Sequence, residues 1–373
     1  MSALIQIVPR LPPPEEGVGG TALALAQALA VRSIATRFIV PRPYGAQAHV
    51  AGLVDVEEIP AEAGALRAEL VAAGRRGERA FLHYANYGYQ ARGCPLWLAA
   101  GLHQAAEVPL WTHFHEVWAT GPPSTSSFWL APVQRRIAAA VARRSARIST
   151  GLPLYAGMIR RTLGAPEREI AIRPTVSAVG EPAEIRPFPA RNRRLAVFGG
   201  AGIRTRAYGE HAAEIAAACL ALDLSEVWDV GPGTVAPESV GPHGGSIPVR
   251  RLGSLPAAEV SALLSETAAG FLAYPLGFLG KSSAFAAYAA HGVLAVCAGR
   301  AAPPGAVPAP GAHFWVPETG TRVAVDPTGL ADIAAAARSW YEGHSLVLQA
   351  AEIAGWLEMP PEGPVTGNMS PPE

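Results

Sequence analysis

Residues 269–297 read AGFLAYPLGFLGKSSAFAAYAAHGVLAVC and decide between two very different folds. Only one residue of this stretch, Lys281, carries a formal charge, so the stretch is apolar and long enough for a membrane-spanning helix. However, Pro275, Gly280 and His291 interrupt it, and each is costly or disruptive in lipid. We therefore predict a buried strand, a loop, a buried helix and a second buried strand.

The composition of the whole chain limits the classes of function. The 373 residues contain 30 basic and 30 acidic side chains, so the formal net charge is zero. This balance argues against a protein that binds nucleic acid through a broad basic face. Cys94, Cys219 and Cys297 lie far apart without metal-ligand spacing, and residues 1–8 lack the basic region of a signal peptide. We expect a reduced, cytoplasmic protein.

Strand and helix patterns alternate along the chain on both sides of a proline-rich segment. Predicted strands cover 3–8, 37–40, 79–84, 109–113, 194–198, 226–230, 269–273 and 293–297. Predicted helices cover 21–30, 63–73, 95–106, 133–143, 211–221, 257–266, 282–291, 328–340 and 344–356. This alternation indicates βαβ units and parallel sheets, and hence an α/β fold of two doubly wound domains in succession.

The domain boundaries follow from the same patterns. Five prolines and several arginines between residues 166 and 194 indicate a linker. We expect an N-terminal Rossmann-like domain over 1–180 and a second over 190–343. A final helix falls within 344–359, and 360–373 has the composition of a disordered tail.

The first candidate site is the glycine-rich loop after the first predicted strand. Gly17-Val-Gly-Gly20 leads into the first predicted helix. There the backbone amides, including those of Gly19 and Gly20, can approach an anion, and the helix dipole favours negative charge. The alternative is that the glycines only permit a tight connection. The spacing is not that of a dinucleotide fingerprint.

A histidine-rich segment, Thr112-His-Phe-His-Glu116, follows another predicted strand. Residues at the carboxyl ends of parallel strands line the crevice in which ligands bind. His113 and His115 alternate and so share one face in extended chain, with Glu116 on the other. His83 ends the preceding strand and could face the same crevice. The alternative is that these are structural histidines, and no third metal ligand lies nearby.

Two loops of the second domain carry candidate anion-binding groups. Gly199-Gly-Ala-Gly-Ile-Arg-Thr-Arg206 places Arg204 and Arg206 after a strand, where guanidinium groups suit a diphosphate. Lys281, Ser282 and Ser283 precede a predicted helix, where hydroxyl groups cap and a cation pairs with phosphate. The alternatives are surface arginines on a solvated loop, and a simple serine cap beside a lysine that reaches solvent.

These motifs together resemble those of the GT-B glycosyltransferases, in particular the large retaining nucleotide-sugar family (glycosyltransferase family 4-like). The likeness covers nearly the whole chain. It rests on 17–20, on 113–116, on the Arg204 and Arg206 pair, on Gly231-Pro-Gly233 and on 253–264. It implies two Rossmann-like domains facing a central cleft, with a C-terminal helix that packs back on the first domain.

The resemblance also implies roles for the candidate residues. His115 would face the transferred sugar, with Glu116 or His113 assisting the acceptor hydroxyl. The donor diphosphate would be held without a metal by seven residues, namely Gly19, Gly20, Arg204, Arg206, Lys281, Ser282 and Ser283. The implied partners are a nucleotide-sugar donor and a glycan, lipid-linked or small-molecule acceptor, with no nucleic acid and with a peripheral membrane contact.

One departure from the family pattern bears on catalysis. The family carries two glutamates, eight positions apart, before a final Ala-x-Gly, which Ala289 to Gly292 matches here. Counting back from this match places Leu279 and Ala287 at the glutamate positions. A second register, which instead aligns Gly277-Phe278, places Leu276 and Ala284 there. The departure motivates an alternative: a non-catalytic GT-B protein that binds a partner enzyme or a glycan. A GT-B epimerase or phosphorylase is a third candidate.

Overall fold

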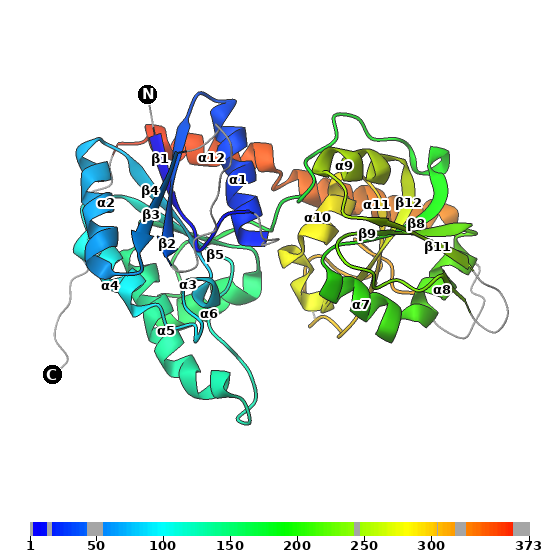
Figure 1. Ribbon diagram of the computed structural model, residues 1–373, viewed down its shortest axis with the longest axis horizontal. Coiled ribbons are helices and arrows are strands. Elements are labelled where there is room, and N and C mark those ends of the chain that lie inside the picture. The colour runs from blue at the N-terminus through cyan, green and yellow to red at the C-terminus, as the bar shows by residue number, and fades with distance from the viewer. Residues whose placement is uncertain are drawn as a thin grey trace. The chain divides into compact units, whose positions relative to one another are not determined.

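The chain forms two compact units, each built around one sheet. The computed structural model describes residues 3–12, 17–42, 55–241, 247–303, 305–317 and 326–360, except for the side chain of Pro327 (Figure 1). The first unit comprises Met1–Pro174 and Leu346–Glu373, and the second comprises Thr175–Ser345. The predicted tail lies outside the described residues, apart from Pro360.

The first unit has a parallel sheet of order β3-β2-β1-β4-β5-β6-β7. Its strands are β1 (Ala3–Ile7), β2 (Ala35–Arg42), β3 (Asp55–Pro60), β4 (Arg79–Tyr84), β5 (Leu110–Phe114), β6 (Arg147–Thr150) and β7 (Ala171–Ile172). Its helices are α1 (Gly17–Ala30), α2 (Ala63–Arg75), α3 (Asn86–Tyr89), α4 (Leu96–Gln104), α5 (Ser126–Arg144), α6 (Pro153–Leu163) and α12 (Leu346–Glu358). The strand order reverses between β1 and β4, so loops from both halves of the sheet meet there.

The second unit repeats this plan with the order β10-β11-β9-β8-β12-β13. Its strands are β8 (Asn192–Phe198), β9 (Glu226–Val230), β10 (Ser239–Val240), β11 (Ile247–Gly253), β12 (Thr267–Ala273) and β13 (Leu294–Ala298). Its helices are η1 (Phe188–Ala190), α7 (Ala201–Glu210), α8 (Ala212–Ala221), α9 (Ala257–Glu266), η2 (Leu276–Lys281), α10 (Ser283–Ala290) and α11 (Pro327–Glu342). All pairings are parallel except that of β10 with β11, and the order reverses between β8 and β12.

The apolar stretch 269–297 falls within β12, η2, α10 and β13, as predicted, and every residue of α10 except Ser283 is buried. Gly270 makes this packing possible, because a Cβ atom there would lie 2.5 Å from the Tyr288 ring. The Tyr288 hydroxyl lies 3.1 Å from the carbonyl oxygens of Ala196 in β8 and Phe271 in β12. One α10 side chain thus spans the two strands at which the order reverses. Among the described residues, no helix is long and apolar enough to cross a bilayer.

Helix α12 packs beside α1 on the first unit (Figure 1). Trp356 contributes to a buried cluster with Leu4, Leu25 and Trp111, and its ring meets the Trp111 ring edge-on at 5.5 Å. The chain therefore leaves the first unit after β7 and returns to it with its last described helix.

Several element predictions were wrong in detail. The sequence patterns did not predict β3, β6, β11 or α6. Residues 201–206 form the first turns of α7 rather than a loop. Similarly, Gly17–Gly20 is the first turn of α1, which begins four residues before the predicted helix. Glycine lowers helix propensity, so glycine-rich first turns read as loops from sequence.

Candidate active site

Three polar side chains form a hydrogen-bonded chain near the carboxyl edge of the first sheet. His83, in β4, lies with its Nε2 atom 2.7 Å from Oε1 of Gln6, in the neighbouring strand β1. The Nδ1 atom of His83 lies 3.0 Å from Nε2 of His115, just after β5. The two imidazole rings are stacked, with an interplanar angle of 19°. Gln6 and His83 are buried, whereas His115 is half-buried.

The hydrogen bonds between Gln6, His83 and His115 determine which ring nitrogen of each histidine carries the proton. The Gln6 amide nitrogen donates to the Ala22 carbonyl, so the Gln6 oxygen must be the atom that faces His83. His83 therefore donates from Nε2, which leaves Nδ1 as its acceptor when the ring is neutral. His115 then donates from Nε2, and its Nδ1 is the acceptor atom of the neutral ring.

Burial keeps His83 neutral. It lowers the pKa of His83 well below the usual range, because a charged imidazolium is poorly solvated inside the protein. Gln6 supplies orientation without charge, so it does not oppose this shift. The result is a fixed, neutral acceptor for the His115 N–H group.

His113 lies beside this chain in a second buried group. Its ring contacts that of His115 edge-on, with centroids 4.5 Å apart. Its Nδ1 atom lies 3.0 Å from the hydroxyl oxygen of Ser149, which also accepts from the Trp111 indole N–H at 2.9 Å. Burial lowers the pKa of His113 to about 4, and the nearby positive charge of Arg173 makes a smaller contribution in the same direction. His113 is therefore neutral and a weak base near neutral pH.

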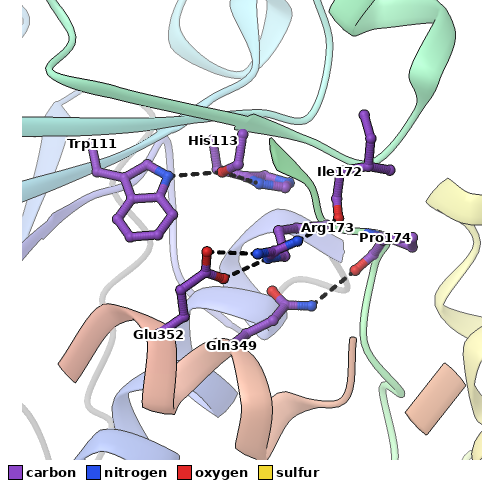
Figure 2. Close-up of polar contacts among 8 residues, drawn as sticks. Trp111, His113, Ile172, Arg173, Pro174, Gln349 and Glu352 are labelled. Carbon is purple, nitrogen blue, oxygen red and sulfur yellow. Dashed lines mark hydrogen bonds and ion pairs between the residues drawn. The ribbon is translucent and has the colours of Figure 1, made fainter. Parts of the chain in front are cut away.

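A bidentate ion pair joins the end of β7 to helix α12. Figure 2 shows the Arg173 guanidinium facing the Glu352 carboxylate, with Nε–Oε2 and Nη2–Oε1 distances of 2.5 and 2.6 Å. Gln349, on the same helix, donates to the Pro174 carbonyl at 3.1 Å. These contacts hold Arg173 near His113, so α12 contributes to the electrostatics of this edge.

The two glycine-rich turns of the second unit contact each other. Gly231 has a φ of +145°, and a Cβ atom there would lie 2.2 Å from the carbonyl oxygen of Gly199. The fully buried side chain of Arg204 forms hydrogen bonds to both turns. Its Nη1 atom pairs with Asp229 Oδ2 at 2.5 Å, its Nε atom donates to Gly199 at 2.9 Å, and its Nη2 atom donates to the Pro232 carbonyl.

The structure separates the two arginines that the sequence motif grouped together. The Arg204 guanidinium lies inside the protein and is saturated by protein acceptors, so Arg204 supports the loop and does not face solvent. Arg206, two residues further along α7, is exposed. Successive helical residues are rotated by about 100°, which turns Arg206 to the other side of the helix.

The remaining predicted anion-binding residues lie at the start of a helix or, for Lys281, directly before the residue that caps one. Ser282 caps α10 by accepting from the Phe285 N–H at 3.2 Å, and Ser283 is the first residue of that helix. Lys281, the only lysine in the chain, ends η2 and is half-buried. Gly19 and Gly20 lie in the first turn of α1. A Cβ atom on Gly19 would lie 2.4 Å from the Arg10 carbonyl oxygen, whereas Gly20 faces open space.

Four residues of the first-unit edge were not predicted: Gln6, Ser149, Arg173 and Glu352. Only Gln6 gave a local signal, as a polar residue inside the apolar strand 3–8. A buried polar side chain needs a hydrogen-bond partner, and that need alone could have drawn attention to it.

Comparison of the sequence with protein-family models finds no match, and neither does comparison with curated proteins. Comparison of the structure with solved structures finds many. HepE from Anabaena, in complex with UDP, is 14% identical, with a TM-score of 0.60 over 96% of this chain and 99% of that chain. An α-glucosyltransferase in complex with UDP is 8% identical, with a TM-score of 0.55 over 96% of this chain and 100% of that chain.

WaaG, a glycosyltransferase involved in lipopolysaccharide biosynthesis, is 11% identical, with a TM-score of 0.53 over 96% of this chain and 100% of that chain. Identities this low establish the fold alone. The predicted resemblance is thereby confirmed at the level of fold: this chain has the GT-B fold of the nucleotide-sugar glycosyltransferases.

Proposed function

We propose that this protein is a glycosyltransferase that moves a sugar from a nucleoside diphosphate sugar to an acceptor hydroxyl, with retention of configuration. The observation that carries the proposal is the chain Gln6–His83–His115, which fixes the tautomer of a half-buried histidine at the edge of the sheet. The fold, shared with two UDP-bound structures, supports a nucleoside diphosphate donor. Retention rests on the family resemblance alone.

We assign the donor diphosphate to the helix starts of the second unit. The first-turn amides of α7 and α10 carry partial positive charge that stabilises phosphate oxygens. Lys281, Ser283 and the exposed Arg206 add a cation, a hydroxyl group and a second cation. These groups offset the charge that develops on the leaving diphosphate, so the proposal invokes no metal. Arg204 and Ser282 act through the backbone that they hold. The contribution of the Gly19 and Gly20 amides to donor binding stays a prediction from the sequence.

We assign orientation of the transferred sugar to His115 and proton transfer from the acceptor to Glu116. His113 is poorly placed for this step, because it is buried and its Nδ1 atom lies 3.0 Å from the Ser149 hydroxyl oxygen. Glu116 is half-buried and directly follows His115. In this proposal the neutral His113 ring packs against the His115 ring and limits its movement.

The single lysine gives a direct test of the donor site. An amine-reactive reagent can modify only Lys281 and the α-amino group, and mass spectrometry distinguishes the two. We expect UDP, GDP or ADP to protect Lys281 and to raise the melting temperature. Lys281→Ala should abolish the temperature increase, whereas Arg250→Ala, which removes an exposed cation from the same unit, should keep it. The proposal fails if no nucleoside diphosphate does either.

One observation favours a second function, a GT-B protein that binds nucleotide or glycan without transfer. Both registers that could supply the family's paired glutamates place buried apolar side chains there. Leu279 and Ala287, in one register, and Leu276 and Ala284, in the other, all belong to one hydrophobic cluster. Nucleotide binding without release of sugar or nucleotide from UDP-, GDP- or ADP-sugars would favour this second function.

We place the protein in the cytoplasm, since Cys94, Cys219 and Cys297 are free thiols. The acceptor is a glycan, a lipid-linked sugar or a small molecule. A peripheral membrane contact is a separate proposal, which does not depend on the transfer reaction.

A further inference from the structure

The first two turns of helix α5 present aromatic side chains to solvent. No residue from Ser126 to Val133 is buried, whereas Gln134, Ile137 and Val141 pack inward. Trp129 is 71% exposed and Phe128 is 40% exposed, although residues of this size normally bury most of their surface. The start of α5 therefore carries an apolar surface that nothing in the described part of the first unit covers.

Arginines extend this surface along the same side of the helix. Arg135, Arg136 and Arg143 are exposed. With residues about 100° apart, these arginines fall within an arc of about 120° that also contains Phe128 and Trp129. We call this set of five residues the α5 solvent face.

The segment of chain that carries this face contains charge of one sign only. Residues 117–166 contain seven arginines and no aspartate, glutamate or lysine. Because the whole chain is neutral, the rest of it carries a net charge of −7. Such segregation produces a local positive field in a protein that looks neutral overall, and it favours an anionic partner.

The two aromatic rings are held in place, and the indole N–H group is satisfied. The Trp129 indole N–H donates to the Pro123 carbonyl at 3.1 Å, and the Phe128 ring meets the Trp129 ring edge-on at 5.4 Å. Trp129 can therefore enter an apolar environment without leaving a bare N–H group. Rings already ordered also lose little conformational entropy on binding.

We propose that the α5 solvent face binds an anionic lipid bilayer, with Phe128 and Trp129 entering the interface and the arginines contacting headgroups. A helix with aromatic and basic residues on one face matches the chemistry of a bilayer surface. A nucleic acid fits less well, because stacking of bases requires rings spaced along a groove. Here the Phe128 and Trp129 rings contact each other on the exposed surface at the start of α5. The proposal does not depend on sugar transfer.

Co-sedimentation with lipid vesicles tests this proposal with the full chain. We expect binding to vesicles that mix phosphatidylcholine with phosphatidylglycerol, and little binding to phosphatidylcholine alone. Since one basic residue near an anionic surface contributes a factor of about five, Arg135→Gln with Arg136→Gln should weaken binding about 25-fold. Phe128→Ser with Trp129→Ser should weaken it about tenfold or more through lost apolar contact.

Matched controls separate this surface from general charge and apolarity. Arg67→Gln with Arg75→Gln removes two exposed arginines from α2, and Leu220→Ser removes an exposed apolar residue from α8. Both controls should bind vesicles like the parent. Unchanged melting temperatures and Lys281 protection in the α5 variants would show that fold and nucleotide binding are intact.

Three results would overturn the proposal: equal binding to neutral and anionic vesicles, α5 variants that bind like the parent, or binding of duplex DNA in place of vesicles. Vesicle binding in a protein that binds no nucleotide would instead remove the proposed function and leave this surface in place.

Discussion

The Nδ1 atom of His83 lies 3.0 Å from the Nε2 atom of His115, and a hydrogen bond to Gln6 fixes the His83 ring. A buried histidine that cannot readily take up a proton thus accepts a hydrogen bond from a half-buried one. His83 does not need to touch a substrate to matter, because it sets which nitrogen of His115 carries the proton. We regard it as a positioning residue.

His83→Phe should misplace His115, and His83→Asn should largely restore it. Phenylalanine keeps the ring but removes the acceptor, whereas the asparagine oxygen can occupy the place of Nδ1. If the proposed function holds, His83→Phe should lower kcat by up to about 100-fold with little change in KM. Nitrogen-15 NMR of the imidazoles gives a readout that does not need activity: the His115 proton should reside on Nε2 in the parent. A proton on Nδ1 would contradict the assigned hydrogen-bond chain.

Changes at the Arg204 ion pair and at Arg206 should have different effects: the first should lower the stability of the protein, and the second should lower its affinity for nucleoside diphosphate. Asp229→Ala leaves the Arg204 guanidinium buried without its carboxylate and should cost about 3–5 kcal/mol of unfolding free energy. Arg206→Gln changes an exposed side chain and should alter stability by less than about 0.5 kcal/mol. It should nevertheless weaken nucleoside diphosphate binding, measured by titration calorimetry. Normal binding by Arg206→Gln would remove Arg206 from the donor site.

Gly19 and Gly20 form a matched pair in the first turn of α1. Gly19→Ala places a Cβ atom against the Arg10 carbonyl, a backbone atom that cannot easily move, and should destabilise the protein by about 1–3 kcal/mol. Gly20→Ala meets open space and should be neutral or stabilising by up to about 1 kcal/mol, because alanine favours a helix. Denaturant unfolding measures both. Equal losses would show that this turn differs from the one described.

The stability of the protein should fall between neutral and acidic pH. Burial lowers the pKa of both His113 and His291 to about 4, from a usual value of about 6.5 in the unfolded chain. Between these values the unfolded chain binds more protons, so the stability present above pH 6.5 is lost as the pH falls towards 4. Each histidine should contribute a loss on the order of 1–2 kcal/mol at about pH 5.

His291→Gln tests this pH dependence away from the candidate site. In the parent, His291 lies 2.7 Å from the Ser261 hydroxyl and 2.8 Å from the Ala287 carbonyl. Glutamine does not titrate, so the difference in unfolding free energy between pH 7 and about pH 5 should shrink in the variant. The carboxylates contribute equally to both proteins and cancel in the comparison. An unchanged difference would show that His291 is not buried in neutral form.

Much of the fold and part of the candidate site could be predicted from sequence. Apolar runs that alternate with helical patterns specify parallel strands and crossover helices, and residues 269–297 formed the predicted strand, helix and strand. The pattern failed for β3, whose sequence DVEEIP is largely polar and in which only Ile59 is buried. An edge strand buries little surface, so its sequence carries little apolar signal.

The predicted strand ends identify the residues that reach the carboxyl edges of the sheets, because all parallel strands of one sheet end on the same side. The strand ends alone therefore bring His83, His113 and His115 to one edge. The hydrogen-bond partner of each polar group depends instead on how the strands and helices pack together. Gln6 and His83 are far apart in the chain but lie next to each other on the neighbouring strands β1 and β4. Arg204 and Arg206 are close in the chain but lie on opposite sides of one helix. These outcomes depend on packing between distant segments, which local sequence patterns do not encode.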